Sequence, residues 1–228
     1  MKFRILVITA AIGALFGCPD DNMTGNQYRY SVQLQNLTAN QPLSPMAVIT
    51  HNQDFHLFAV GSSASLELEQ LAEGGDNSGL LAMQDSNRDI ELALSGNGVI
   101  LPGQSDLLEL TINRNKSGYL SLASMLVNTN DGFVGSANVE LLSLKVGESL
   151  QMPVPVWDAG TELDDESAAT VPGPAAGGEG FNAARDDVDQ VSFHSGVISA
   201  DDGLASSALN ATHRFNNPGA MLTITRVK

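Results

Sequence analysis

The sequence contains little cysteine, few aromatic residues and few basic side chains. Its single cysteine is Cys18, so no disulfide can form within the chain. Lys and Arg together number 11 against 26 Asp and Glu. A nucleic-acid partner is therefore not expected, because phosphate binding requires a basic face. Aromatic residues make up 5% of the chain and Trp157 is the sole tryptophan, which argues against the aromatic cleft of a sugar-cleaving enzyme.

The motifs of common catalytic sites are also missing. The chain has no Gly-x-Ser-x-Gly nucleophile elbow, no His-Glu-x-x-His pair and no glycine-rich phosphate loop. Its four histidines are scattered without zinc-like spacing: His51, His56, His194 and His213. We therefore expect a protein that is not an enzyme. A secreted hydrolase is the third-ranked alternative, in which Asp158 and Glu162 would act as a carboxylate pair.

The first 17 residues have the pattern of a signal peptide. Lys2 and Arg4 precede an apolar run over residues 5–16, which is too short to span a bilayer. The run leads to Gly17 and Cys18 and resembles a bacterial lipoprotein signal, which implies that Cys18 becomes the lipidated first residue of the mature chain. Phe16 is larger than the residue usual at its position, so an ordinary secretory signal is the alternative.

The mature chain would be strongly acidic. Removal of the signal takes away two basic residues and no acidic ones, which changes the formal net charge from −15 to −17. Residues 18–27 predict a polar tether to a folded domain over residues 28–228. We expect this domain in the bacterial cell envelope, anchored by lipid and facing the periplasm or the cell surface, or else secreted. An acidic surface suits both solubility and cation binding, and charge alone does not choose between them.

Most of the expected domain has the pattern of short strands. Apolar and polar residues alternate from Tyr28 to Gln35, as in a half-buried strand. Other β-prone runs bounded by turn residues lie at 46–50, 55–60, 90–94, 106–113, 119–127, 139–144, 150–157, 190–198 and 220–227. Turn signals recur about every ten residues without long helices between them. The sequence therefore predicts an all-β fold, an antiparallel β-sandwich.

Two segments interrupt the strands. Residues 64–73 predict a short helix with Ser63 or Ser65 as its N-cap, and residues 78–84 predict a second helical turn. We expect both to cover the open end of the sandwich. Residues 161–189 place acidic residues around a stretch of Gly, Ala and Pro, and they predict a long acidic surface loop at one end of the sandwich.

Two apolar runs end in acidic turns that contain glycine, and they suggest a metal site. Asp131 lies in the first turn, and Asp158 and Glu162 lie in the second. Calcium takes six to eight oxygen ligands in flexible geometry, so these three carboxylates could bind it together with backbone carbonyls and water. The alternative is that Asp131 and Asp158 only cap their turns.

The same residues resemble a known family. Ser-Met-Leu-Val-x-Thr-Asn-Asp-x-Phe-Val-Gly at residues 124–135 and Asp-Ala-Gly-Thr-Glu at residues 158–162 are similar to the spondin domain, and the likeness extends over most of residues 28–228. This resemblance implies a calcium-binding β-sandwich with calcium carboxylates at Asp131, Asp158 and Glu162. Glu162 stands where animal members have Asp.

The combined interpretation is a lipid-anchored, non-enzymatic calcium-binding module. We expect it to be monomeric and to bind a matrix, protein or glycan partner that the sequence does not identify. The competing hypothesis is direct, calcium-dependent docking on anionic lipid through the calcium loops. That mode needs basic or apolar loop tips, and Phe133 is the main apolar residue that the two motifs offer.

Overall fold

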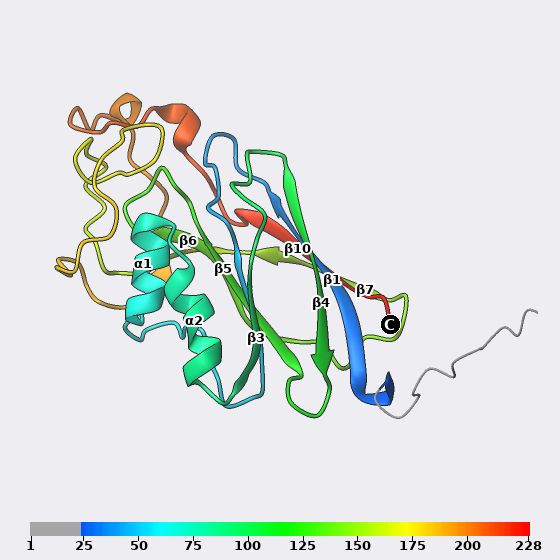
Figure 1. The fold of residues 1–228 in the computed structure, drawn as a ribbon. Coiled ribbons are helices and arrows are strands. Elements are labelled where there is room, and N and C mark those ends of the chain that lie inside the picture. Colours follow the sequence, from blue (N-terminus) through cyan, green and yellow to red (C-terminus); the bar gives the residue numbers. More distant parts are fainter. Residues whose placement is uncertain (1–23) are drawn as a thin grey trace, which may run out of the picture.

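The computed structural model describes residues 24–228, so the predicted signal peptide and the lipidation site at Cys18 lie outside the described residues. Figure 1 shows two antiparallel sheets packed face to face. The first sheet contains, in spatial order, β4 (Ser105–Asn113), β1 (Gln27–Asn36), β10 (Ala220–Arg226) and β7 (Ser149–Val154). The second contains β3 (Ile90–Ser95), β2 (Ala47–His51), β5 (Tyr119–Met125), β6 (Gly132–Glu140), β8 (Val156–Asp158) and β9 (Ser192–Phe193). The predicted antiparallel β-sandwich is therefore confirmed.

The main core fills the space between the two sheets. Alternate residues of β1 point into it, and Tyr30, Val32 and Leu34 are fully buried. They pack against residues of the facing sheet such as Leu120 and Leu122 of β5. The sequence predicted this alternation of buried and exposed side chains along β1. Burial of each large apolar side chain contributes roughly 1.5–3 kcal/mol, so this layer dominates the stability of the fold.

Two helices cover the outer face of the six-stranded sheet. They are α1 (Leu66–Gly74) and α2 (Ser78–Ser86). Ser65 caps α1, since its side chain accepts a hydrogen bond from the Leu68 N–H, and Gly75 ends the helix with φ of 68°. Leu68 and Leu71 form a second core cluster with residues of the sheet's outer face. The expectation that the helices close the open end of the sandwich is therefore wrong, because their apolar stripe packs on a sheet face (Figure 1).

Several strands differ from the sequence prediction. Residues 55–60 form no strand, because β2 already pairs with β3 and β5, and Phe55 and Leu57 pack into the second core cluster instead. The run at 139–144 contributes only its first two residues, at the end of β6. Residues 132–138, which form most of β6, were not among the predicted strands. Only Ser192–Phe193 of the run at 190–198 forms a strand.

The run at 150–157 divides between the two sheets. β7 belongs to the four-stranded sheet and β8 to the six-stranded sheet, with Pro155 between them. Proline has no N–H to donate to a ladder, so it marks the point where the chain leaves one sheet for the other. This crossing sets the position of Asp158 at the end of β8.

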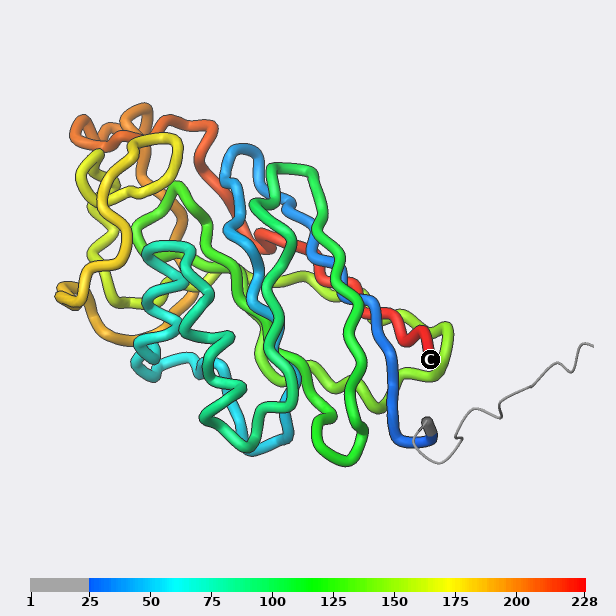
Figure 2. Tube along the Cα trace, viewed as in Figure 1, coloured from blue at the N-terminus to red at the C-terminus, as the bar shows by residue number. Residues whose placement is uncertain are grey.

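The long segment after β8 has no helix or strand from Thr161 to Asp189. It is not only a surface loop, because Val171 is fully buried and forms a third small cluster with Val197 and Leu209. The segment lies beside α1 (Figure 2), where Arg185 donates to the Glu69 carboxylate and to the Ala64 carbonyl. Three short 3-10 helices complete the described chain: η1 (Thr24–Asn26), η2 (Ala200–Asp202) and η3 (Ala211–His213). No helix within residues 24–228 is long and apolar enough to cross a membrane.

Candidate metal centre

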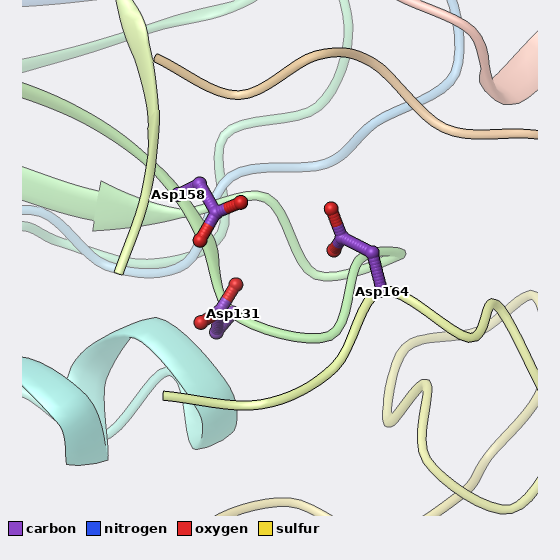
Figure 3. A group of neighbouring side chains, drawn as sticks. All are labelled: Asp131, Asp158 and Asp164. Carbon is purple, nitrogen blue, oxygen red and sulfur yellow. The ribbon is translucent and has the colours of Figure 1, made fainter. Parts of the chain in front are cut away.

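Pairing of β6 with β8 brings the two acidic turns together. Gly132 is the register partner of Asp158, so Asp131, one residue before β6, lies beside the end of β8. The long segment then returns over this edge and adds Asp164. Figure 3 shows the three carboxyl groups converging on one space. One oxygen from each of Asp131, Asp158 and Asp164 lies within 4.8 Å of the others, so the three groups could hold a single cation.

Asp131 is the buried centre of the group. Its Oδ2 accepts hydrogen bonds from the backbone N–H of Thr161 at 2.8 Å and of Glu162 at 3.1 Å, and from the Thr161 hydroxyl at 3.2 Å. These bonds fix the orientation of the carboxylate. Its Oδ1 is buried and has no hydrogen-bond partner. A buried carboxylate oxygen without a partner is costly, so a cation would satisfy it.

Asp158 is partly exposed and has two roles. Its Oδ1 accepts a hydrogen bond of 2.7 Å from the backbone N–H of Gly160, whose φ is 70°. The capping alternative considered for Asp158 therefore describes one of its oxygens. Capping of the turn and participation in the carboxylate group are compatible.

Burial and neighbouring carboxylates raise the pKa of all three groups. Burial and the neighbouring Asp158 carboxylate raise the pKa of Asp131 to about 7. Burial and the carboxylates of Asp158 and Asp131 raise the pKa of Asp164 to about 8. Burial also raises the pKa of Asp158, with Asp187 adding to the effect. Without a cation the group therefore holds protons near neutral pH, and a bound cation would reverse these shifts.

Asp164 is a candidate ligand that the sequence analysis missed. It is two residues beyond the expected Glu162 and was counted only as part of the acidic loop. Its Oδ1 is buried without a hydrogen-bond partner. The acidic residues between Glu162 and Glu166, interrupted by Leu163, are the only sequence signal for it, because nothing in their spacing shows which one folds back toward β8.

Glu162 lies near the group but is not one of the three converging residues. Its backbone N–H binds Asp131, while burial and then the Glu73 carboxylate raise the pKa of its own side chain to about 8. Its Oε2 is buried and has no partner. Metal binding by Glu162 stays a prediction.

His194 closes one side of the centre. Its side chain is fully buried, and burial lowers its pKa to about 4. Nδ1 accepts a hydrogen bond from the Gly196 N–H, so Nε2 carries the proton of the neutral ring. Nε2 lies 3.7 Å from Asp164 Oδ1, which is beyond hydrogen-bond distance, so both buried atoms remain without a partner.

Unsatisfied polar atoms are concentrated at this end of the sandwich. Within residues 24–228, seven buried side-chain nitrogen or oxygen atoms lack a hydrogen-bond partner. Six of the seven belong to Glu73, Asp131, Glu162, Asp164, Glu166 and His194. Native proteins leave few such atoms, so their concentration makes this end of the sandwich the candidate binding site.

Phe133 does not form an apolar tip. It is fully buried and its ring lies 5.3 Å from that of Phe58. The expectation that it could contact lipid is therefore wrong. Other large apolar side chains are exposed instead, Leu163 and Val188 on the segment after β8, Phe193 in β9 and Ile198 beyond it.

Comparison with known proteins supports the relationship read from the two motifs. The family model described as Spondin_N matches residues 30–175, which include Asp131, Asp158 and Asp164. A comparison with curated proteins gives no significant match. The matched region covers more than half of the chain and most of the sandwich. The chain therefore belongs to the spondin family, whose domains are extracellular modules.

Proposed function

We propose that this protein is a non-enzymatic calcium-binding module that acts outside the cytoplasm. Asp131, Asp158 and Asp164 would supply the carboxylate ligands. The observation that carries the proposal is the convergence of three carboxylates around buried oxygens that have no hydrogen-bond partner. An all-oxygen donor set favours a hard cation, and calcium tolerates the irregular geometry that ligands from separate segments provide.

The role that we infer for calcium is to hold the segment after β8 against the sandwich. Asp131 and Asp158 are fixed by the β6–β8 ladder, whereas Asp164 belongs to the long segment. A cation shared by all three would cross-link the segment to the sheet. The exposed side chains that the segment carries would then have a defined arrangement, as binding to a matrix, protein or glycan partner requires.

A calcium titration followed by calorimetry tests the metal site. The unaltered protein should bind calcium, and Asp164→Asn should weaken the binding at least tenfold because it removes a charged ligand of similar shape. The matched control is Asp85→Asn on the exposed surface of α2, which should bind calcium as the unaltered protein does. Equal affinity for all three proteins would contradict the proposal.

We further propose that Cys18 anchors the module to the cell envelope through a lipid. The supporting observation is the order of charge, apolar run and cysteine at the N-terminus. The protein would then be displayed at the envelope surface with its acidic end free to meet a partner.

Direct docking on a lipid surface is the second candidate function, and one observation favours it. Four apolar side chains in and after the segment that follows β8 are each more than half exposed: Leu163, Val188, Phe193 and Ile198. Exposed apolar side chains beside a calcium site could enter an interface, although the net negative charge of the chain opposes binding to anionic lipid. Co-sedimentation of a soluble Cys18→Ser protein with vesicles that contain phosphatidylserine, with and without calcium, separates the two functions. Binding that requires calcium would favour lipid docking.

A further inference from the structure

Charge is distributed unevenly between the two ends of the sandwich. Residues 159–219, which lead from β8 to β10, contain ten Asp and Glu but only two basic residues, Arg185 and Arg214. The other seven Lys and Arg of the described chain lie outside this segment. Figure 2 shows the segment after β8 at the upper left and the start of β1 at the lower right, so the end where β1 begins lies far from the acidic residues.

Five basic residues gather where β1 begins: Arg29, Arg114, Lys116, Arg226 and Lys228. The Arg29 N–H donates to the Lys228 carbonyl at 2.9 Å, which joins the start of β1 to the residues after β10. Tyr28 lies beside two guanidinium groups, since the central carbons of Arg226 and Arg114 are 3.4 Å and 5.1 Å from its ring centroid. We call these five residues the basic surface.

The charges of the basic surface are available for an external partner. None of the five forms a salt bridge with another described residue, and all except the partly buried Arg226 are exposed. Acidic residues also reach this end: Asp54, Glu91, Glu140 and Glu148. Glu91 accepts a hydrogen bond from the Asn113 N–H at 2.9 Å, and Glu148 lies 3.7 Å from Lys145, which is not one of the five.

An exposed apolar side chain lies beside the basic surface. Val146, in the turn between β6 and β7, is 62% exposed and follows Lys145. The N–H of the next residue, Gly147, donates to the Arg226 carbonyl at 2.8 Å, which fixes this turn against the basic surface. Basic side chains with an apolar tip suit a phospholipid surface, which offers both phosphate groups and an apolar layer. A sulfated polysaccharide offers only the charge.

The chain before β1 connects this same end to Cys18. Six residues separate Cys18 from Thr24, and an extended chain of that length spans at most about 20 Å. A lipid on Cys18 would therefore hold the start of β1 close to the bilayer. The ten residues of β1 extend for about 33 Å, whereas charges are screened beyond about 10 Å in 0.1 M salt. Repulsion between the acidic end and an anionic membrane is thus weak in this orientation.

We propose that the basic surface docks on anionic phospholipid headgroups of the membrane that holds the lipid at Cys18. This inference rests on the proposed anchor, which raises the local concentration of the domain at the membrane, so a weak contact suffices. Docking in this way turns the candidate metal centre away from the membrane and toward a partner. It needs no calcium, in contrast to docking through the calcium loops.

Co-sedimentation of the Cys18→Ser protein in chelator tests the basic surface. The protein should bind vesicles of phosphatidylcholine and phosphatidylglycerol at low salt, lose this binding at high salt, and fail to bind phosphatidylcholine alone. Adding Arg29→Gln and Lys228→Gln should weaken binding about thirtyfold, since each basic residue near an anionic surface contributes about a factor of five. The matched control is Arg214→Glu, which lowers the net charge by the same two units in the acidic segment and should bind as its parent does.

Each contrary outcome identifies a different error. Equal weakening by Arg214→Glu would show that only net charge matters, and binding that requires calcium would assign the contact to the calcium loops. Retention on heparin without binding to vesicles would make the basic surface a polysaccharide site. Each of these results would overturn the proposal. If the double variant does not show the parent's melting transition, Lys228→Gln alone should weaken binding about fivefold. Because the Cys18→Ser protein has no lipid, this test is independent of the anchor, which fatty-acid labelling of the unaltered protein tests separately.

Discussion

Gly132 and Asp158 face each other in the β6–β8 ladder, and no larger residue fits at the glycine. A Cβ atom at position 132 would lie 2.7 Å from Thr129 Oγ1 and 2.8 Å from His194 Cδ2. The hydroxyl of Thr129 accepts a hydrogen bond from the Gly132 N–H, so this contact belongs to the turn that presents Asp131. The close approach of the backbone to His194 is therefore a condition for assembling the centre.

Gly132→Ala should lower the free energy of unfolding by about 1–3 kcal/mol, because the added methyl group forces either Thr129 or His194 out of place. Urea denaturation measures this effect. Gly98→Ala is the matched control, since a Cβ at position 98 meets no atom within 4 Å, and it should change the stability by no more than about 0.5 kcal/mol. Equal effects of the two substitutions would show that the packing around Gly132 tolerates a methyl group.

Arg185 should be a main structural link between the long segment and α1. Its guanidinium binds Glu69, Asp189 and the Ala64 carbonyl, and the Glu69 side chain is only 3% exposed. Arg185→Ala would leave the Glu69 carboxylate buried without its partner, so stability should fall by about 3 kcal/mol, the lower end for a broken buried pair because Arg185 itself is partly exposed.

A double-mutant cycle separates the ion pair from the packing of the arginine stem. Adding Glu69→Gln to Arg185→Ala removes the uncompensated charge, so the double variant should be more stable than Arg185→Ala alone. Strictly additive losses would mean that Arg185 acts through its other contacts.

The sandwich could be predicted from the sequence because its strands alternate clearly. The residues of β1 from Tyr30 to Leu34 and the run of β10 carry a period of two that only a half-buried strand explains. β6 was not predicted, because Gly132 and Gly135 are of a type that is common in turns and uncommon inside strands. In the structure these glycines allow close packing, as a Cβ at Gly135 would meet the Phe133 ring at 2.8 Å.

The candidate site could be predicted only in part. Asp131 and Asp158 follow apolar runs, and neighbouring strands bring such positions together. Asp164 had no comparable signal, because it lies in a segment without periodic structure. Tertiary packing, which a local pattern does not encode, decides which members of an acidic run face the centre.

Processing at Cys18 is tested by one substitution. The unaltered protein should incorporate a radiolabelled fatty acid in a bacterial host and enter the detergent phase of a phase separation. Cys18→Ser should lose the label and move to the aqueous phase. Unchanged partitioning of Cys18→Ser would show that the signal is cleaved elsewhere or retained.

Calcium should stabilise the native protein through the site at Asp131, Asp158 and Asp164. At a hundredfold excess over the dissociation constant, one ion adds about 2.7 kcal/mol. A change of this size should raise the melting midpoint by roughly 5–10 °C in a domain of this length. Asp158→Asn should lose most of this shift, because Asn can keep the cap on the Gly160 N–H but brings no charge.

The calcium-free midpoint of Asp158→Asn supplies the control. Removing one of three repelling carboxylates should leave that midpoint level or raise it. A variant that keeps the full calcium response would show that Asp158 serves only as a turn cap.

In chelator, stability should fall as the pH rises from about 5 to 8. Burial raises the pKa of Asp131 to about 7 and that of Asp164 to about 8, well above the values of about 3.9 for unfolded aspartate. The native state therefore binds more protons than the unfolded state across this range, and the free energy of unfolding decreases with rising pH. Melting curves at pH 5 and pH 8 measure the slope. Saturating calcium should flatten or reverse it, because the ion replaces the protons and binds the ionised carboxylates. A calcium-free midpoint that rises toward pH 8 would mean that these aspartates are ionised and compensated by the protein itself, which would remove the electrostatic basis for the cation.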